Sequence, residues 1–128
     1  MSTTLEVGEK LVALCREGQN LQAIETLYSD DICSVEAMAG EGFPQVMQGK
    51  QVVIGKGKWW SENHEVHSAS VKGPFPHGDD RFAVIFNFDV TSKPLGGVRM
   101  QMEEVAIYTV SNGKVVREEF FFRAGGAG

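Results

Sequence analysis

The fold is decided by residues 81–123, which read RFAVIFNFDVTSKPLGGVRMQMEEVAIYTVSNGKVVREEFFFR. Apolar and polar residues alternate in three runs of this stretch, and a period of two is typical of half-buried β-strands. Pro94, Gly96 and Gly97 separate the first two runs, and Asn112-Gly113 between the last two is a strong hairpin signal. The stretch therefore predicts antiparallel strands over 81–91, 98–110 and 114–123.

The residues before this stretch predict one more long strand and three helices. A period of two continues through 64–73, and the turn after it is marked by Pro74, Pro76, Gly78 and Asp79. Helical spacing of apolar residues predicts helices over 7–15, 21–28 and 50–61. Gly18 ends the first helix, Asn20 caps the second, and 29–31 ends it. A short strand over 32–36 and a loop over 37–48 complete the pattern.

Helices at the start of the chain and a meander of strands at its end predict an α+β domain. A long twisted sheet curls, and helices that cover its concave face leave a cone-shaped α+β barrel with an internal pocket. We therefore expect three N-terminal helices on the concave face of a curved, mainly antiparallel sheet. The 128 residues fit one domain, which we place at 1–123, followed by a flexible tail at 124–128.

Composition argues against several classes of function. A net charge of -5 disfavours nucleic acid as a partner, because phosphate binding needs a clustered positive face. Cys15 and Cys33 are too few for a disulfide framework or a zinc site, so we expect buried free thiols. His64 and His67 are three apart in a predicted strand, so their side chains point to opposite faces and cannot bind one metal ion together. No signal peptide or membrane span is visible, and we expect a cytoplasmic protein without metal or cofactor.

Alternation along the strands also predicts which residues face the pocket. The concave face is mostly Phe, Met and Val, and Trp60 of the third helix is in phase with Val53, although spacing alone does not choose between Trp59 and Trp60. We predict that the substrate-binding residues are Tyr28, Trp60, Phe86, Phe88, Met102, Tyr108, Glu118 and Phe122.

Three acids, Glu36, Glu104 and Glu118, fall on the same apolar face. A carboxyl group buried there with no cation beside it has a raised pKa, which makes it a useful acid or base near neutral pH. The alternative for each acid is a place at the rim or an ion pair with Arg99 or Arg117. A one-residue bulge would also turn Glu118 outward. We take Glu36 and Glu104 as the candidate catalytic residues.

Four features of the sequence carry a family resemblance: AIETLYSDD at 23–31, Gly49 before the third helix, EVAIYTV at 104–110 and NGKVV at 112–116. In these features, and over nearly its whole length, the chain resembles the SnoaL-like domains of the nuclear transport factor 2-like superfamily. The resemblance implies the cone fold and a pocket for a small apolar, oxygenated molecule. Relatives of this kind include polyketide cyclases, steroid isomerases, dehydratases and epoxide hydrolases, and the fold alone does not choose among them.

One branch of that superfamily, the ketosteroid isomerases, assigns a catalytic carboxylate to a position that corresponds to Glu36 when counted from Tyr28. The second acid of that branch falls near Glu104 or Ala106. Where the branch has a tyrosine in the first helix, this chain has 11–15, LVALC. A SnoaL-like cyclase needs only one acid/base, and the resemblance implies Glu36 or Glu104 for this role.

Two classes of function stay open: a cofactor-independent isomerase, cyclase, hydrolase or lyase, and a non-catalytic ligand-binding or structural domain. A pocket that holds a ring system, with Glu36 at its base, favours the enzyme. A cavity filled by Phe86, Met102 and Phe122 favours the second class. We also expect a homodimer through the convex sheet face, because an apolar patch there needs covering. That patch consists of Ala83, Ile85, Val105, Ile107 and Phe121.

Overall fold

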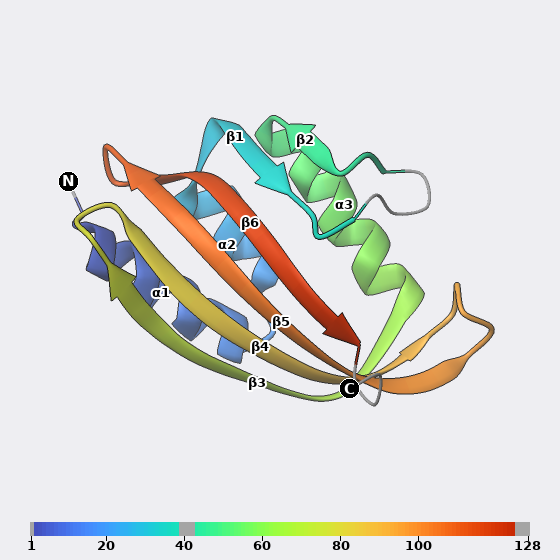
Figure 1. The fold of residues 1–128 in the computed structure, drawn as a ribbon. Helices are drawn as coiled ribbons and strands as arrows, with labels where there is room; N and C mark the ends of the chain where they lie inside the picture. Colours follow the sequence, from blue (N-terminus) through green and yellow to red (C-terminus); the bar gives the residue numbers. More distant parts are fainter. Residues whose placement is uncertain (1, 39–42, 125–128) are drawn as a thin grey trace.

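The strands form one curved, unclosed sheet in the computed structural model, which describes residues 2–38 and 43–124 (Figure 1). The helices are α1 (Thr4–Arg16), α2 (Asn20–Leu27) and α3 (Lys50–Asn63). The strands are β1 (Tyr28–Val35), β2 (Val46–Gln48), β3 (His64–His77), β4 (Arg81–Ser92), β5 (Val98–Ser111) and β6 (Lys114–Ala124).

The sheet has the strand order β2-β1-β6-β5-β4-β3, and all neighbours are antiparallel except β1 and β6. The three helices pack on its concave face, where α1 lies against β3 and β4, and α3 lies against β1 (Figure 1). This arrangement confirms the predicted fold class. No helix among the described residues is long and apolar enough to cross a membrane.

The helix ends follow from local signals, with two corrections at α2. Thr3 and Glu6 form a capping box at the start of α1, and Gly18, with φ +75°, follows its end. The predicted N-cap of α2 is wrong, because Asn20 is already helical and Gln19 takes the cap position without a side-chain hydrogen bond. The helix ends at Leu27, so residues 29–31 belong to β1 and not to the end of α2.

Two predicted boundaries in the strands and loops are also wrong. Strand β3 runs on through Pro74 and Pro76 to His77, so only Gly78 to Asp80 form the turn. An edge strand tolerates proline because its outer N–H groups have no ladder partner, and β3 is at the edge. The predicted loop over 37–48 contains β2, and Ala124 ends β6. The rest of the predicted tail, 125–128, and residues 39–42 lie outside the described residues.

The β5–β6 hairpin sets which side chains of β6 face inward. Asn112 and Gly113 have φ of +53° and +74°, as a two-residue hairpin turn requires. Val110 pairs with Val115 but Thr109 pairs with Arg117, so one extra residue bulges in β6. Strict alternation from Glu118 would place Val115 on the outer face, but the bulge makes Val115 fully buried, and Glu118 stays on the concave face.

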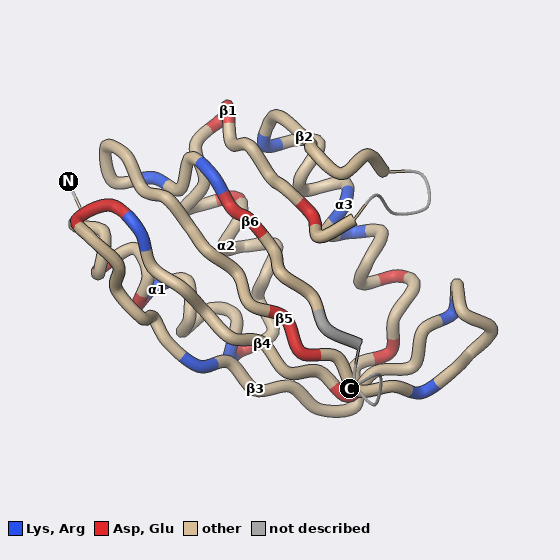
Figure 2. Tube along the Cα trace, in the orientation of Figure 1, with Lys and Arg blue, Asp and Glu red and all other residues tan. Residues whose placement is uncertain are grey.

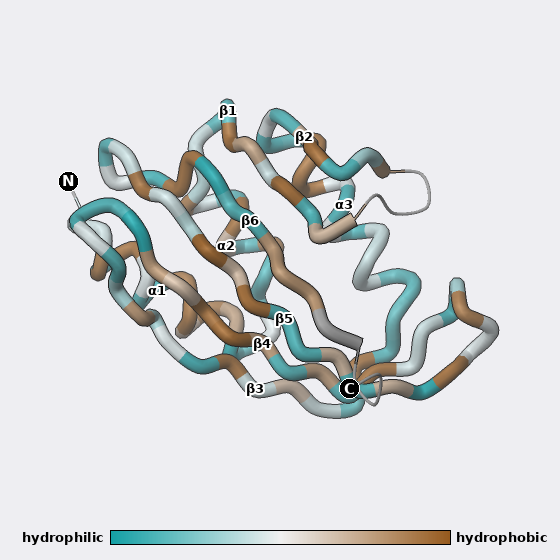
Figure 3. Tube along the Cα trace, viewed as in Figure 1, coloured by the Kyte–Doolittle hydropathy of each residue, from teal (hydrophilic) through white to brown (hydrophobic). Residues whose placement is uncertain are grey.

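The core is packed where α1 crosses the sheet. Leu11 and Val12 of α1 are buried together with Phe82 and Tyr108, whose rings stack with centroids 5.0 Å apart. A Cβ added at Gly8 would lie 2.9 Å from Pro74 Cβ, so this close approach of α1 needs glycine. Hydrophobic residues run along β4, β5 and β6 over this region (Figure 3). Charged residues of both signs are spread along the chain (Figure 2).

Candidate functional site

A cavity of about 870 Å³ opens between the concave face of the sheet and helices α2 and α3. Its wall is predominantly apolar and carries a few polar groups, as small-molecule sites usually do. All the predicted site residues lie in this wall, although their roles remain predictions: Tyr28, Glu36, Trp60, Phe86, Phe88, Met102, Glu104, Tyr108, Glu118 and Phe122.

A lysine that the sequence analysis did not assign to the site holds the acids together. The ammonium nitrogen of Lys56, on α3, lies 2.6 Å from Glu36 Oε2, 3.0 Å from Ser34 Oγ and 3.5 Å from Glu118 Oε2. The same nitrogen lies 4.8 Å from the centre of the Phe120 ring. All three N–H donors of Lys56 therefore have partners in the protein.

Glu118 is the most buried of the three cavity acids and is only 2% exposed. Its carboxylate accepts hydrogen bonds from the Tyr28 hydroxyl and, at 2.6 Å, from Ser34 Oγ. The alternative that a bulge turns Glu118 outward is wrong. The bulge lies at Val116, before Glu118, and it sets Glu118 opposite Tyr108, which lines the same cavity.

The two arginines considered as partners for the acids pair elsewhere. Arg99 forms an ion pair with Asp89, with 2.9 Å between Nη2 and the carboxylate, and Arg117 approaches Glu119 at 3.8 Å. The predicted pairing of the cavity acids with Arg99 or Arg117 is therefore wrong.

Glu36 follows β1 and points into the cavity, but a cation lies beside it, whereas the sequence argument assumed a carboxyl group with no cation nearby. A carboxyl group without a nearby cation was the condition for a raised pKa, and Lys56 forms a 2.6 Å ion pair with Glu36. The argument from an unpaired buried charge therefore does not apply to Glu36.

Glu104, the second predicted catalytic residue, meets that condition better. Burial raises the pKa of Glu104 to about 7, and the negative charges of Glu36 and Glu118 add to the rise while Lys56 opposes it. Its Cα pairs with those of Phe86 on β4 and Phe122 on β6, so aromatic residues flank it in the sheet. Within the described side chains it has no hydrogen-bond or ion-pair partner.

The lysine and the two tyrosines of the cavity keep fixed protonation states at neutral pH. Burial lowers the pKa of Lys56, but the charges of Glu118 and Glu36 outweigh burial and raise the pKa above its ordinary value. Burial and the charge of Glu118 raise the pKa of Tyr28 and of Tyr108 well above the usual range.

The two cysteines are free and half-buried, so the expectation of free thiols holds but that of full burial does not. Burial, with the charge of Glu118, raises the pKa of the Cys15 thiol to about 12. Although Cys15 lines the cavity, it therefore carries no thiolate nucleophile at neutral pH.

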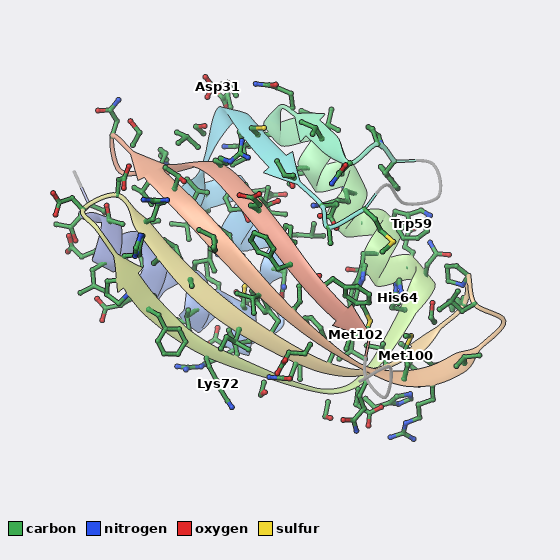
Figure 4. All side chains as sticks on the ribbon, viewed as in Figure 1. Asp31, Trp59, His64, Lys72, Met100 and Met102 are labelled. Atoms are coloured by element: carbon green, nitrogen blue, oxygen red, sulfur yellow. The ribbon has the colours of Figure 1, made fainter. Side chains whose placement is uncertain are left out.

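Aromatic rings from α3 and the strands form part of the cavity wall. The Trp60 ring stacks on His64 with centroids 4.4 Å apart and lies 5.4 Å from Phe88. Trp59 also lines the cavity, so both tryptophans belong to its wall. Trp59, His64 and Met102 lie toward the same end of the molecule, while Asp31 and Lys72 point away from it (Figure 4). Within residues 2–38 and 43–124, no group of three His, Cys, Asp or Glu side chains is placed to hold a metal ion.

The sequence did carry a signal for Lys56. This residue falls in the apolar stripe of the third helix with Val52, Val53, Trp59 and Trp60, and a charged residue in such a stripe needs a partner when it is buried. Ser34 gave a weaker signal, because it shares a strand face with Glu36 but serine is common on strands.

Comparison with known proteins identifies the family and agrees with the fold. The model of the SnoaL-like domain family matches residues 2–122, so the chain belongs to that family. A proposed SnoaL-like polyketide cyclase from Mesorhizobium loti is 45% identical with a TM-score of 0.87, over 94% of this chain and 99% of that one.

More distant solved structures share the fold. A proposed isomerase from Bacillus subtilis is 17% identical with a TM-score of 0.73, over 94% of this chain and 86% of that one. A proposed polyketide cyclase from Pseudomonas putida is 16% identical with a TM-score of 0.70, over 96% of this chain and 93% of that one. A comparison with curated proteins gives no match.

Proposed function

We propose that this SnoaL-like protein binds a small, mainly apolar molecule in its cavity and moves a proton on it without a cofactor, with Glu104 as the acid/base. The observation that carries the proposal is an unpartnered carboxyl group in the wall of an open cavity, with a pKa raised to about 7. A group with such a pKa populates both of its forms at neutral pH, as an acid/base catalyst needs. The reaction class is isomerisation or cyclisation.

The size of the cavity supports binding. A volume of about 870 Å³ falls within the range of about 300–1,000 Å³ that small-molecule pockets span. Phe86, Met102 and Phe122 line the space and do not fill it. In the proposed reaction, the Glu104 carboxylate takes a proton from a carbon beside a carbonyl group of the substrate and returns it to another position.

In this scheme Lys56 is a positioning residue. Its ammonium group contacts Glu36 and Glu118, so Glu104 is the acid of the wall that has no cation in contact with it. Glu36 stays a candidate for a second carboxylate that touches the substrate, because it lies in the wall and is partly exposed.

One observation favours the alternative of a binding protein without turnover. Catalysis of this kind needs a donor for the negative charge that develops on the substrate oxygen. The three donors of Lys56 are already directed at Ser34, Glu36 and Glu118, so this cation does not serve that oxygen in the present geometry.

The test begins with a thermal-shift screen of apolar ring ketones and related oxygenated molecules, because a ligand that binds the native state raises its melting temperature. Each hit is then incubated in D2O, and exchange of its carbon-bound hydrogens is followed by mass spectrometry. We expect exchange with the wild type and with Glu103→Gln, whose side chain is exposed, and none with Glu104→Gln. Hits without exchange support the binding protein, and a screen without hits contradicts both functions.

We also propose a homodimer through the convex face of the sheet. Its candidate contact patch spans β4, β5 and β6, where Val105 lies opposite Ile85 and Phe121, and Ile107 lies opposite Ala83. Phe121 is 49% exposed and the other four are partly exposed, so the patch is open on the protomer.

A further inference from the structure

The charges that line the cavity do not balance. Among the described lining residues, the acids are Glu36, Glu104 and Glu118, and the one base is Lys56. With every acid ionised, three negative charges face one positive charge, so the net charge of the wall is -2. A neutral ligand leaves this excess in place and an anionic ligand increases it, whereas a cationic ligand reduces it.

The excess charge is located at Glu104. Lys56 contacts Glu36 and Glu118 directly, at 2.6 and 3.5 Å, and the Tyr28 and Ser34 hydroxyls also donate to Glu118. Glu104 receives none of these contacts, and its side chain is half-buried in the wall of the open cavity. A carboxylate that is partly removed from water and has no partner is unfavourable, and a cation in the cavity would stabilise it. The structure therefore contains a carboxylate whose partner is absent from the described side chains.

The surroundings of Glu104 suit an organic cation. Phe86 and Phe122 flank it on the neighbouring strands. The Phe86 ring stacks on Phe88 with centroids 5.9 Å apart, and Phe88 continues to Trp60 at 5.4 Å. Aromatic faces attract an ammonium group, and the attraction grows when water is excluded. A hydrated metal ion needs several oxygen ligands, and no three acidic, His or Cys side chains among the described residues are placed to hold one.

We infer that the ligand of this cavity has an apolar body and a protonated amine, and that the amine pairs with Glu104 between the aromatic rings. The inference rests on the proposed function, because it concerns the same cavity and narrows its substrate class.

Three probes with one apolar body separate this inference from simple hydrophobic binding: 4-phenylbutylamine, 4-phenylbutan-1-ol and 4-phenylbutyrate. Their dissociation constants are measured by isothermal titration calorimetry at about pH 8, where the amine is protonated and Glu104 is mostly ionised. We expect the amine to bind at least about tenfold more tightly than the alcohol, and the butyrate to bind most weakly. At about pH 5.5, where Glu104 is protonated, the advantage of the amine should fall by about tenfold.

Variants test whether Glu104 causes the preference. Glu104→Gln should bind amine and alcohol equally, while Glu103→Gln, on the same strand and exposed, should keep the wild-type preference. Phe122→Leu is a second variant and should weaken amine binding more than alcohol binding, because it removes an aromatic face.

The outcomes distinguish the two proposals. Equal binding of amine and alcohol by the wild type, or an unchanged preference in Glu104→Gln, overturns the ligand class and leaves the small-molecule function standing. Binding by none of the three probes overturns the ligand class and also counts against the proposed function.

Discussion

The ammonium group of Lys56 contacts two carboxylates, Glu36 and Glu118. The contribution of this cation to the free energy of unfolding is best measured by removing it. An ion pair that is taken out of water contributes little net stability, but the loss of one partner leaves the other charge buried and unpaired. Glu118, with a side chain 3% exposed, is the group most affected, because water reaches Glu36, at 29%, more easily.

Lys56→Met should therefore lower the free energy of unfolding by about 3–5 kcal/mol near neutral pH, as measured by urea denaturation. The deficit should shrink at acid pH, because protonation removes the unpaired charges. Lys58→Met, an exposed change on the same helix, is the control and should stay within about 0.5 kcal/mol of the wild type. Equal effects of the two substitutions would contradict the role given to Lys56.

Glu104 gives the protein a pH-dependent stability whose sign is opposite to that of a salt-bridged acid. The pKa of Glu104 is about 7 in the folded chain against 4.5 for an ordinary glutamate, so the folded state binds the proton more tightly. The free energy of unfolding should fall as the pH rises from about 4.5 to about 7 and level off above, by roughly 3 kcal/mol at most.

Urea denaturation of the wild type and of Glu104→Gln across this range measures the effect. The variant should lose this fall in stability, while Glu103→Gln should retain it. A wild type whose stability rises steadily from pH 4.5 to pH 7 would show that Glu104 is ionised early and has found a partner.

At the scale of elements, helix α3 contains two glycines that differ in how closely other residues pack against them. A Cβ at Gly55 would meet no atom within 4 Å, whereas a Cβ at Gly57 would lie 2.9 Å from Leu21 Cδ2 of α2. Gly55→Ala should therefore stabilise the protein by about 1 kcal/mol, which is the helix propensity difference. Gly57→Ala should gain less, because Leu21 must move. Thermal denaturation of the two variants makes the comparison, and an equal gain would argue against close packing at Gly57.

The elements that the sequence predicts are those with a sustained period. Strands β4, β5 and β6 were predicted to within one residue at each end, because alternation and the Asn112-Gly113 turn act over short distances. Strand β2 was missed since three residues carry no period. The prolines of β3 were taken for a turn because edge position is a property of the sheet and not of the segment. Strict alternation in β6 would place Val115 on the outer face, and it does not reveal the extra residue at Val116 that brings Val115 to the buried face.

At the scale of the whole molecule, the wall of the cavity could be predicted but its charge arrangement could not. Alternation and helical phase depend on neighbours in sequence, and they brought all the predicted site residues to one cavity. The network of Lys56 depends on how α3 crosses the sheet, since its contacts to Ser34 and Glu118 join residues 22 and 62 apart. No local pattern encodes that crossing.

The predicted dimer is the remaining property of the whole molecule. Val105 lies at the centre of the convex patch, between Ile85 and Phe121, and an apolar patch across three strands favours a two-fold symmetric contact. In sedimentation experiments at micromolar concentration, the wild type should therefore have twice the 14.0 kDa mass of the chain. Val105→Asp should be monomeric, because a carboxylate in the centre of an apolar interface is buried without a partner.

Leu95→Asp is the matched control, because Leu95 is 58% exposed in the β4–β5 turn and lies outside the patch. It should keep the wild-type mass. The cavity lies on the opposite, concave face, so a monomeric Val105→Asp protein should still bind the ligand of the wild type. A monomeric wild type, or a dimer that survives Val105→Asp, would exclude this face as the contact.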